Sequence, residues 1–245
     1  MTIRSMVWQT AIGAAPVVPG GKLGDRVRFN IVKATHRAPL KIVIAKGDTA
    51  VQVGATGRGE IWEMLRLVGP HGRLIVVEPA PENLEEIHAR LQRENITNVT
   101  VIPKGAWSER TTQTLYIHPR FKGSHIVLDS GAQHDRVLDR DEYAAATTIE
   151  CDTLDRLLAE YGVTHVDFIK VTVMGAEMQV LRGMDRLLAT TPKLWIKAHA
   201  MYEGQPVNGV ISRLLQERGY QTIITRGNEG PDGKLRRGDV YATRM

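Results

Sequence analysis

The fold is decided by residues 48–60, which read DTAVQVGATGRGE. An apolar, β-prone run ends there in three glycines within six residues, and apolar residues at helical spacing follow over residues 61–68. The pattern predicts a strand, a tight turn and a helix. Because glycines let a backbone come close to a ligand and a new helix presents unpaired N–H groups, such a turn is typical of a nucleotide-type cofactor site.

Outward from this turn, β-prone and helix-patterned segments alternate along the chain. Strands are predicted at residues 41–45, 73–77, 98–103, 112–117, 146–150, 166–171, 193–200, 220–225 and 239–243. Helices are predicted at residues 23–34, 61–68, 81–91, 152–161, 175–188 and 207–218. This alternation predicts an α/β fold with a doubly wound, mostly parallel, Rossmann-like sheet and helices on both faces. The last two strands lack a helix between them, which predicts an antiparallel C-terminal strand.

The length of 245 residues fits one α/β domain with some elaboration. We expect residues 1–40 to form an N-terminal arm and residues 41–245 to form the domain. Residues 119–145 are the least regular part of the chain and are expected to be a loop insertion. Long ordered loops in compact domains are often lids or binding loops, so this insertion is a candidate cover for a site.

The composition is ordinary for a globular protein in water. The formal net charge is +5 and the pI about 9.4, but basic and acidic residues are interleaved, so no nucleic-acid partner is clearly indicated. Cys151 is the only cysteine, which excludes an intramolecular disulfide and a cysteine zinc site and favours a cytoplasmic location. No stretch reaches the length of a membrane span, so no membrane partner is expected. The apolar N-terminal stretch is compatible with a homodimer.

The residues that end each predicted strand are the candidates for a site, because ligands of doubly wound sheets bind beyond the carboxyl ends of the strands. Glu78 follows the strand predicted at residues 73–77 and lies nineteen residues after Gly59, where an acid can accept hydrogen bonds from ribose hydroxyls. The other candidates are, in chain order, Gly54, Ala55, Thr56, Gly57, Pro79, Gly105, Ala106, Trp107, Lys170 and His199.

The glycine spacing bears on which cofactor the turn would hold. Gly54, Gly57 and Gly59 do not have the Gly-x-Gly-x-x-Gly spacing of dinucleotide-binding proteins. S-adenosylmethionine fits better, because it has a ribose for Glu78 but no pyrophosphate. A nicotinamide dehydrogenase is the weaker alternative, which a response to NAD would reveal.

Several segments carry a resemblance to a known family. They are residues 51–59, Val76–Asn83 with its Glu-Pro-x-Pro-Glu-Asn run, Gly105–Ser108, Cys151–Asp155 and Val166–Glu177. In this order they resemble the FkbM-type methyltransferases, over roughly residues 45–225. The resemblance implies a class I methyltransferase fold, S-adenosyl-L-methionine as methyl donor, and O-methylation of a hydroxyl on a sugar, polyketide or other natural product. The family usually has acids at the positions of Gln52, Thr172 and Met174, and often at that of Lys197.

Methyl transfer to an alcohol requires an aligned acceptor and a base. His199 is the predicted base, or else a strand-end histidine bonded to backbone. Lys170 is predicted to orient substrate or cofactor, or else to extend to solvent. Ala106 is expected to contact the base of the cofactor through its backbone, and Trp107 either to pack on the adenine or to fill the space under the turn. No metal site is expected, because no His, Asp or Glu cluster has ligand spacing.

Two classes of function follow. The first is an S-adenosylmethionine-dependent methyltransferase that acts on a small-molecule hydroxyl acceptor. The second is a family-like binding or assembly subunit that has lost catalysis, an alternative favoured by Gln52 and Met174 in place of acids.

Overall fold

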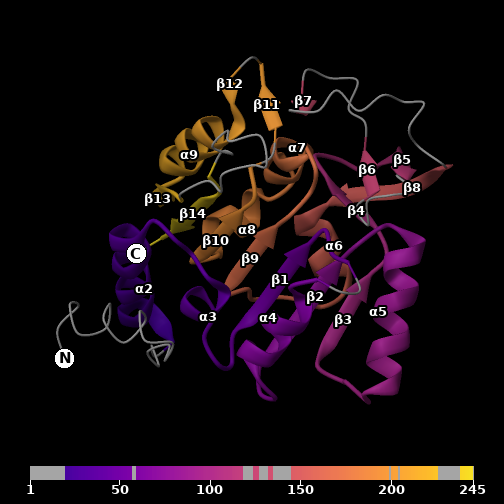
Figure 1. Cartoon of the computed structure of the whole chain (residues 1–245), viewed down its shortest axis with the longest axis horizontal. Coiled ribbons are helices and arrows are strands. Elements are labelled where there is room, and N and C mark those ends of the chain that lie inside the picture. The colour runs from indigo at the N-terminus through magenta and orange to yellow at the C-terminus, as the bar shows by residue number, and fades with distance from the viewer. Residues whose placement is uncertain are drawn as a thin grey trace, which may run out of the picture.

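The computed structural model describes residues 20–56, 59–117, 124–126, 132–134, 145–198, 200–203, 205–225 and 238–244. A central sheet of seven strands runs through the molecule (Figure 1). Its order is β13 (Gln221–Ile224), β14 (Val240–Thr243), β10 (Lys193–Ile196), β9 (Phe168–Val171), β1 (Thr49–Val53), β2 (Arg73–Val77) and β3 (Val99–Ile102). The strands from β10 to β3 pair in parallel, while β14 is antiparallel to both its neighbours. The predicted mostly parallel sheet with an antiparallel C-terminal strand is therefore confirmed.

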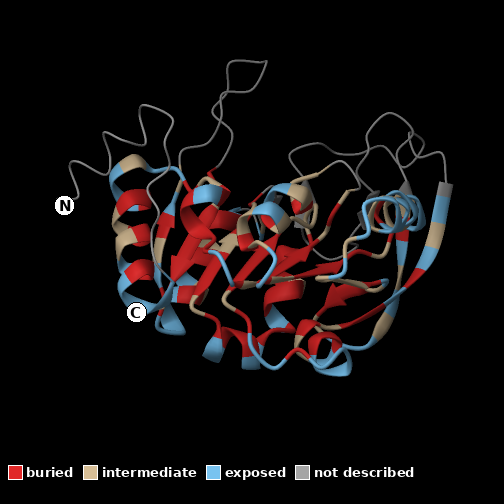
Figure 2. Cartoon of the chain, turned by 90° about the horizontal axis from the view of Figure 1, so that it is seen from below, coloured by how far each residue is buried: buried red, intermediate tan, exposed pale blue. Residues whose placement is uncertain are grey.

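Helices cover both faces of this sheet. One face packs on α2 (Gly21–Thr35), α3 (Leu40–Val43), α4 (Ile61–Val68) and α5 (Pro81–Arg93), and the other on α6 (Leu154–Glu160), α7 (Glu177–Arg182), α8 (Asp185–Thr190) and α9 (Val207–Glu217). Successive strand residues point to opposite faces of the sheet. Ala50 packs in the apolar cluster on the face covered by α2 to α5, whereas Val51 and Val53 pack in the cluster on the face covered by α6 to α9. Figure 2 shows the buried residues concentrated in the strands. None of these described helices is long and apolar enough to cross a membrane.

Two small sheets lie beyond the central one, in the upper part of Figure 1. The first has the order β4 (Gly105–Trp107), β8 (Ala145–Thr153), β5 (Thr111–Ile117) and β6 (Ser124–Ile126). The second has the order β12 (Gln205–Pro206), β11 (Ala200–Tyr202) and β7 (Ala132–His134). Residues 119–145, predicted as a loop insertion, thus contain β6, β7 and the first residue of β8. The rest of that insertion lies outside the described residues.

Three predicted elements differ from the structure. The strand predicted at residues 193–200 is too long, because β10 ends at Ile196 and Ala200 begins β11 in a separate small sheet. The strand predicted at residues 41–45 is wrong: residues 41–43 lie in α3, where the N–H groups of Ile42 and Val43 both donate to the Pro39 carbonyl oxygen, and residues 44–45 belong to no strand. The single helix predicted at residues 175–188 is also wrong, because α7 and α8 are separated at Gly183. A Cβ on this glycine would lie 2.0 Å from the carbonyl oxygen of Trp107, so the backbone of β4 passes directly against the break.

Helix α2 is anchored to the sheet by buried charges. The Lys193 Nζ lies 2.8 Å from Asp48 Oδ2 and 3.3 Å from Asp25 Oδ1. Asp25 also pairs with Arg28 at 3.4 Å, one helical turn later. The buried apolar side chains of α2 and α3 belong to the core cluster on that face. The described part of the expected N-terminal arm, residues 20–40, therefore packs on the sheet, and residues 1–19 lie outside the described residues.

Candidate functional site

The glycine turn after β1 is held against the end of β9. Gly54 has a φ of +76°, in the left-handed region that favours glycine. A Cβ at this position would lie 2.1 Å from the carbonyl oxygen of Thr172, so glycine is required by space as well as by conformation. The turn closes where the Gly59 N–H donates to the Thr56 carbonyl oxygen at 2.9 Å. Helix α4 begins just beyond it.

Glu78, which directly follows β2, is a buried carboxylate that holds the turn. Its Oε2 accepts from the Ala55 N–H at 2.7 Å, and its Oε1 accepts from the Ala80 N–H at 2.9 Å and from Asn83 Nδ2 at 3.1 Å. Burial raises the pKa of Glu78, and these three donors only partly oppose the rise. Because a carboxylate oxygen can accept two hydrogen bonds, Oε2 keeps capacity for one further donor.

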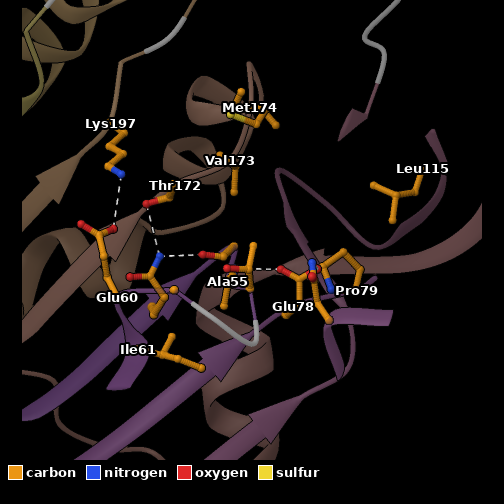
Figure 3. Close-up of a pocket in the computed structure, with 16 residues that line it drawn as sticks. Ala55, Glu60, Ile61, Glu78, Pro79, Leu115, Thr172, Val173, Met174 and Lys197 are labelled. Carbon is orange, nitrogen blue, oxygen red and sulfur yellow. Dashed lines mark hydrogen bonds and ion pairs between the residues drawn. The ribbon is translucent and has the colours of Figure 1, made fainter. Parts of the chain in front are cut away.

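A cavity of about 410 Å³ lies at the carboxyl ends of β1, β2, β9 and β10. Its volume is within the range of about 300–1,000 Å³ that is typical of small-molecule sites. Figure 3 shows Glu60 and Lys197 on one side of the cavity and the apolar Leu115 on the opposite side. The lining residues are Gln52, Gly54, Ala55, Thr56, Gly59, Glu60, Ile61, Glu78, Pro79, Asn83, Leu115, Thr172, Val173, Met174, Ala176 and Lys197.

The side chain of Gln52 bridges the ends of β1 and β9. Its Nε2 donates to the Gly54 carbonyl oxygen at 2.6 Å and lies 3.3 Å from Thr172 Oγ1. Since a carbonyl oxygen only accepts, this contact fixes which end of the amide is the nitrogen. The Gln52 Oε1 is buried and has no hydrogen-bond partner within the described part of the chain. A buried acceptor without a partner is unfavourable, so a ligand that supplies a donor would stabilise it.

Lys170, Glu60 and Lys197 form a charged cluster. Figure 3 shows Glu60 and Lys197 together at one side of the pocket. The fully buried Lys170 ammonium is ion-paired with Glu60 Oε2 and donates to Thr172 Oγ1 at 2.9 Å. The Lys197 Nζ lies 3.3 Å from the same Glu60 oxygen. Burial alone would raise the pKa of Glu60, but the two ammonium groups outweigh it and lower that pKa. Burial and the Lys197 charge lower the pKa of Lys170, and Glu60 opposes them.

The structure brings together the predicted residues of the first two strand ends. Gly54, Ala55, Thr56, Glu78 and Pro79 all line the pocket.

The remaining predicted residues are placed otherwise. The structure does not bring Gly105, Ala106 and Trp107 to the pocket lining, because β4 pairs with β8 in an outer sheet. Trp107 is buried in an apolar cluster that includes the pocket residues Leu115 and Ala176, so it supports the pocket from behind, and its contact with adenine stays a prediction.

Lys170 is fully buried and does not line the pocket, although it contacts the pocket residues Glu60 and Thr172. Gly57 and His199 lie outside the described residues.

Several further pocket residues had not been predicted as site residues, and three of them are instructive. Asn83 ends the Glu-Pro-x-Pro-Glu-Asn run, and its place in the first turn of α5 is a signal that could have found it. Glu60 follows the last glycine of the turn directly, which is a similar signal. Leu115 comes from β5, and no local pattern in the sequence indicates that this strand reaches the pocket.

The strand order, the antiparallel β14 and a ligand-sized pocket at the strand ends define an α/β fold of the class I methyltransferase type. A crystal structure of methyltransferase FkbM from Methylobacillus flagellatus has a TM-score of 0.56 and 14% identity, and covers 98% of this chain and 57% of that one. A putative methyltransferase from Streptococcus mutans, in complex with SAH, has a TM-score of 0.50 and 10% identity, and covers 84% of this chain and 93% of that one. At these identities the likeness concerns the fold.

Residues 52–222 match the methyltransferase FkbM domain, and the chain belongs to this family. Methyltransferase sdnD of Sordaria araneosa is 22% identical over 187 residues, which cover 66% of this chain and 70% of that protein. Methyltransferase 1 of Beauveria bassiana is 25% identical over 125 residues, 47% of this chain and 50% of that protein. The AMB antimetabolite synthetase AmbE of Pseudomonas aeruginosa is 30% identical over 127 residues, 50% of this chain. The match spans 6% of that synthetase and half of the Beauveria protein.

Proposed function

We propose that this protein uses S-adenosylmethionine to methylate a hydroxyl group on a small molecule, such as a sugar or another natural product. The observation that carries the proposal is the buried Glu78 carboxylate, bonded at 2.7 Å to the glycine-turn backbone at Ala55 beside a cavity of about 410 Å³. Membership of the FkbM family supports methyl transfer as the reaction. The Streptococcus mutans protein of like fold was solved with SAH, which supports the choice of cofactor.

The pocket residues fit this cofactor in three respects. The Glu78 Oε2 keeps capacity for one donor, such as a ribose hydroxyl. The Gln52 Oε1 is a buried acceptor that needs a donor, and the cofactor carries an ammonium group. The apolar side chains of Ile61, Leu115 and Val173 offer walls for the adenine ring. When bound, the cofactor would supply a methyl group on a positively charged sulfur.

The chain's own residues would hold the reactants and accept the proton. Methyl transfer to a hydroxyl needs the attacking oxygen close and in line, and it needs a base for the hydroxyl proton. His199 stays the predicted base on sequence position, two residues after the pocket-lining Lys197. Lys170 is assigned as a positioning residue, because its ammonium contacts the pocket residues Glu60 and Thr172 without lining the pocket itself.

Isothermal titration with S-adenosylmethionine and S-adenosylhomocysteine tests the cofactor. We expect both to bind, and Glu78→Gln to weaken both about tenfold or more, because a charge-assisted hydrogen bond is lost. The matched control Glu82→Gln changes an exposed acid in the first turn of α5 and should leave both affinities unchanged. Failure of the unaltered protein to bind either ligand would overturn the proposal.

Methyl-labelled cofactor tests the acceptor chemistry. Label should appear in alcohols from a panel of hydroxylated sugars and natural products, and not in their amine or carboxylate counterparts. His199→Ala should lower the rate about 100-fold or more while leaving cofactor affinity unchanged, as expected for loss of a general base. Transfer to amines or carboxylates alone would contradict the hydroxyl assignment.

A further inference from the structure

The two lysines of the charged cluster differ in how fully their donors are used. An ammonium group has three N–H donors. Lys170 is completely buried and is directed toward Glu60, toward Thr172 Oγ1 at 2.9 Å and toward the ring of Trp195 at 5.0 Å. Within the described residues, Lys197 has a single polar side-chain partner, Glu60, at 3.3 Å. Two donors of Lys197 are therefore left for other partners.

Lys197 presents these donors to the pocket. Its side chain lines the cavity and keeps 28% of its area exposed. Figure 3 shows it on the side of the pocket away from Glu78, and the lining also includes the apolar Met174. In such surroundings, where water is partly excluded, a charge-assisted hydrogen bond is stronger than on an open surface.

The acidic side chains near Lys197 do not accept from its two remaining N–H donors. Glu60 shares one oxygen between Lys170 and Lys197. Glu78 is bonded to two backbone N–H groups and an amide on the other side of the pocket. Asp239 lies within electrostatic range of Lys170, but its carboxylate accepts from Trp195 Nε1 at 3.0 Å and it does not line the pocket. An anionic group in the pocket would therefore find Lys197 as its partner.

We propose that Lys197 is an anion-recognition residue, which binds a carboxylate or phosphate group of a ligand held in this pocket. The inference rests on the proposed function, since it takes this pocket as the methyl-transfer site. Glu60 is the positioning residue for Lys197: its carboxylate is held by the ion pair with Lys170, and the same oxygen holds the Lys197 ammonium at the pocket wall. Two sources present the same chemistry, namely the α-carboxylate of S-adenosylmethionine and an acidic group of the methyl acceptor.

Paired cofactor probes examine the first source. S-adenosylmethionine and decarboxylated S-adenosylmethionine differ in one carboxylate, so the ratio of their dissociation constants isolates that group. If the cofactor supplies the anion, the unaltered protein should prefer S-adenosylmethionine about tenfold or more. Lys197→Met should abolish this preference, and Lys197→Arg should restore most of it.

Inorganic phosphate examines the second source. It is titrated into the ligand-free protein and into the protein saturated with S-adenosylhomocysteine. If the acceptor supplies the anion, the two cofactor probes should bind equally, and phosphate should bind the saturated protein but not its Lys197→Met variant. The proposal is overturned if Lys197→Met leaves both the cofactor ratio and the phosphate affinity unchanged.

Lys104→Met is the matched control. The Lys104 side chain keeps 27% of its area exposed and pairs with Glu150 at 3.7 Å, but it does not line this pocket. The Lys104→Met substitution should leave both the ratio of cofactor dissociation constants and the phosphate affinity unchanged. If the unaltered protein binds neither adenosyl ligand, the proposed function fails, while phosphate binding to the ligand-free protein still decides the role of Lys197. If the adenosyl ligands bind and Lys197→Met has no effect, only the present inference fails.

Discussion

The substitution Gly54→Ala tests the geometry of the glycine turn, because the added methyl group meets two separate penalties. A φ of +76° is unfavourable for any residue with a Cβ, by about 1 kcal/mol. The Cβ would also lie 2.1 Å from the Thr172 carbonyl oxygen, so one backbone must move by about 1 Å. Overpacking of this kind contributes about 2 kcal/mol. We therefore expect the free energy of unfolding to fall by about 3 kcal/mol.

Urea unfolding followed by circular dichroism measures this change, and a thermal scan should show a midpoint lower by about 6 to 12 °C. Gly162→Ala is the matched control, because its φ is +68° but no atom lies within 4 Å of an added Cβ. It should lose only the conformational part, about 1 kcal/mol. Equal losses in the two variants would refute the claim that Thr172 crowds the turn.

Three further outcomes are expected. Lys193→Met should lower the free energy of unfolding by about 3 to 5 kcal/mol, because the buried Asp25 and Asp48 lose their shared partner; a loss under about 1 kcal/mol in urea would contradict this. Cys151, whose thiol pKa burial raises to about 11, should resist a thiol reagent at mildly alkaline pH until the protein is unfolded; rapid labelling of folded protein would disprove it. Cofactor affinity should decline as the pH falls through the Glu78 pKa, which burial raises above the ordinary value of a glutamate, because protonation removes the accepting charge; an identical decline in Glu78→Gln would count against this.

The parts of the site that the sequence predicted have local signals. Gly54 lies between an apolar strand and a helical pattern, and Glu78 ends an apolar strand before a proline-started helix, so each position follows from its neighbours. The same local reasoning failed at residues 41–45. Their β-branched composition favours a strand, but the chain after Pro39 makes a helical turn and buries Leu40, Ile42 and Val43 in the core.

The charged cluster could not have been predicted, because it depends on contacts between distant parts of the chain. Glu60 and Lys197 are 137 residues apart, and they meet only because β9 lies between β1 and β10 in the sheet. The break between α7 and α8 is similar, since it reflects the backbone of Trp107 pressing on Gly183. Strand order and the approach of one backbone to another are set by the packing of the whole domain, and short windows of sequence do not contain them.

The central position of β1 has a consequence for synthesis and folding. Thr49 pairs with Arg73, soon after it in the chain, whereas Ala50 pairs on the other side with Phe168. In a growing chain, one edge of this apolar strand has no partner until β9 has emerged, and the outer strands from β4 to β8 are made in that interval. Unpaired strand edges promote aggregation. Insertions in the segment from β4 to β8 would therefore lengthen the time during which β1 has an unpaired edge, and this limits how much that segment can grow.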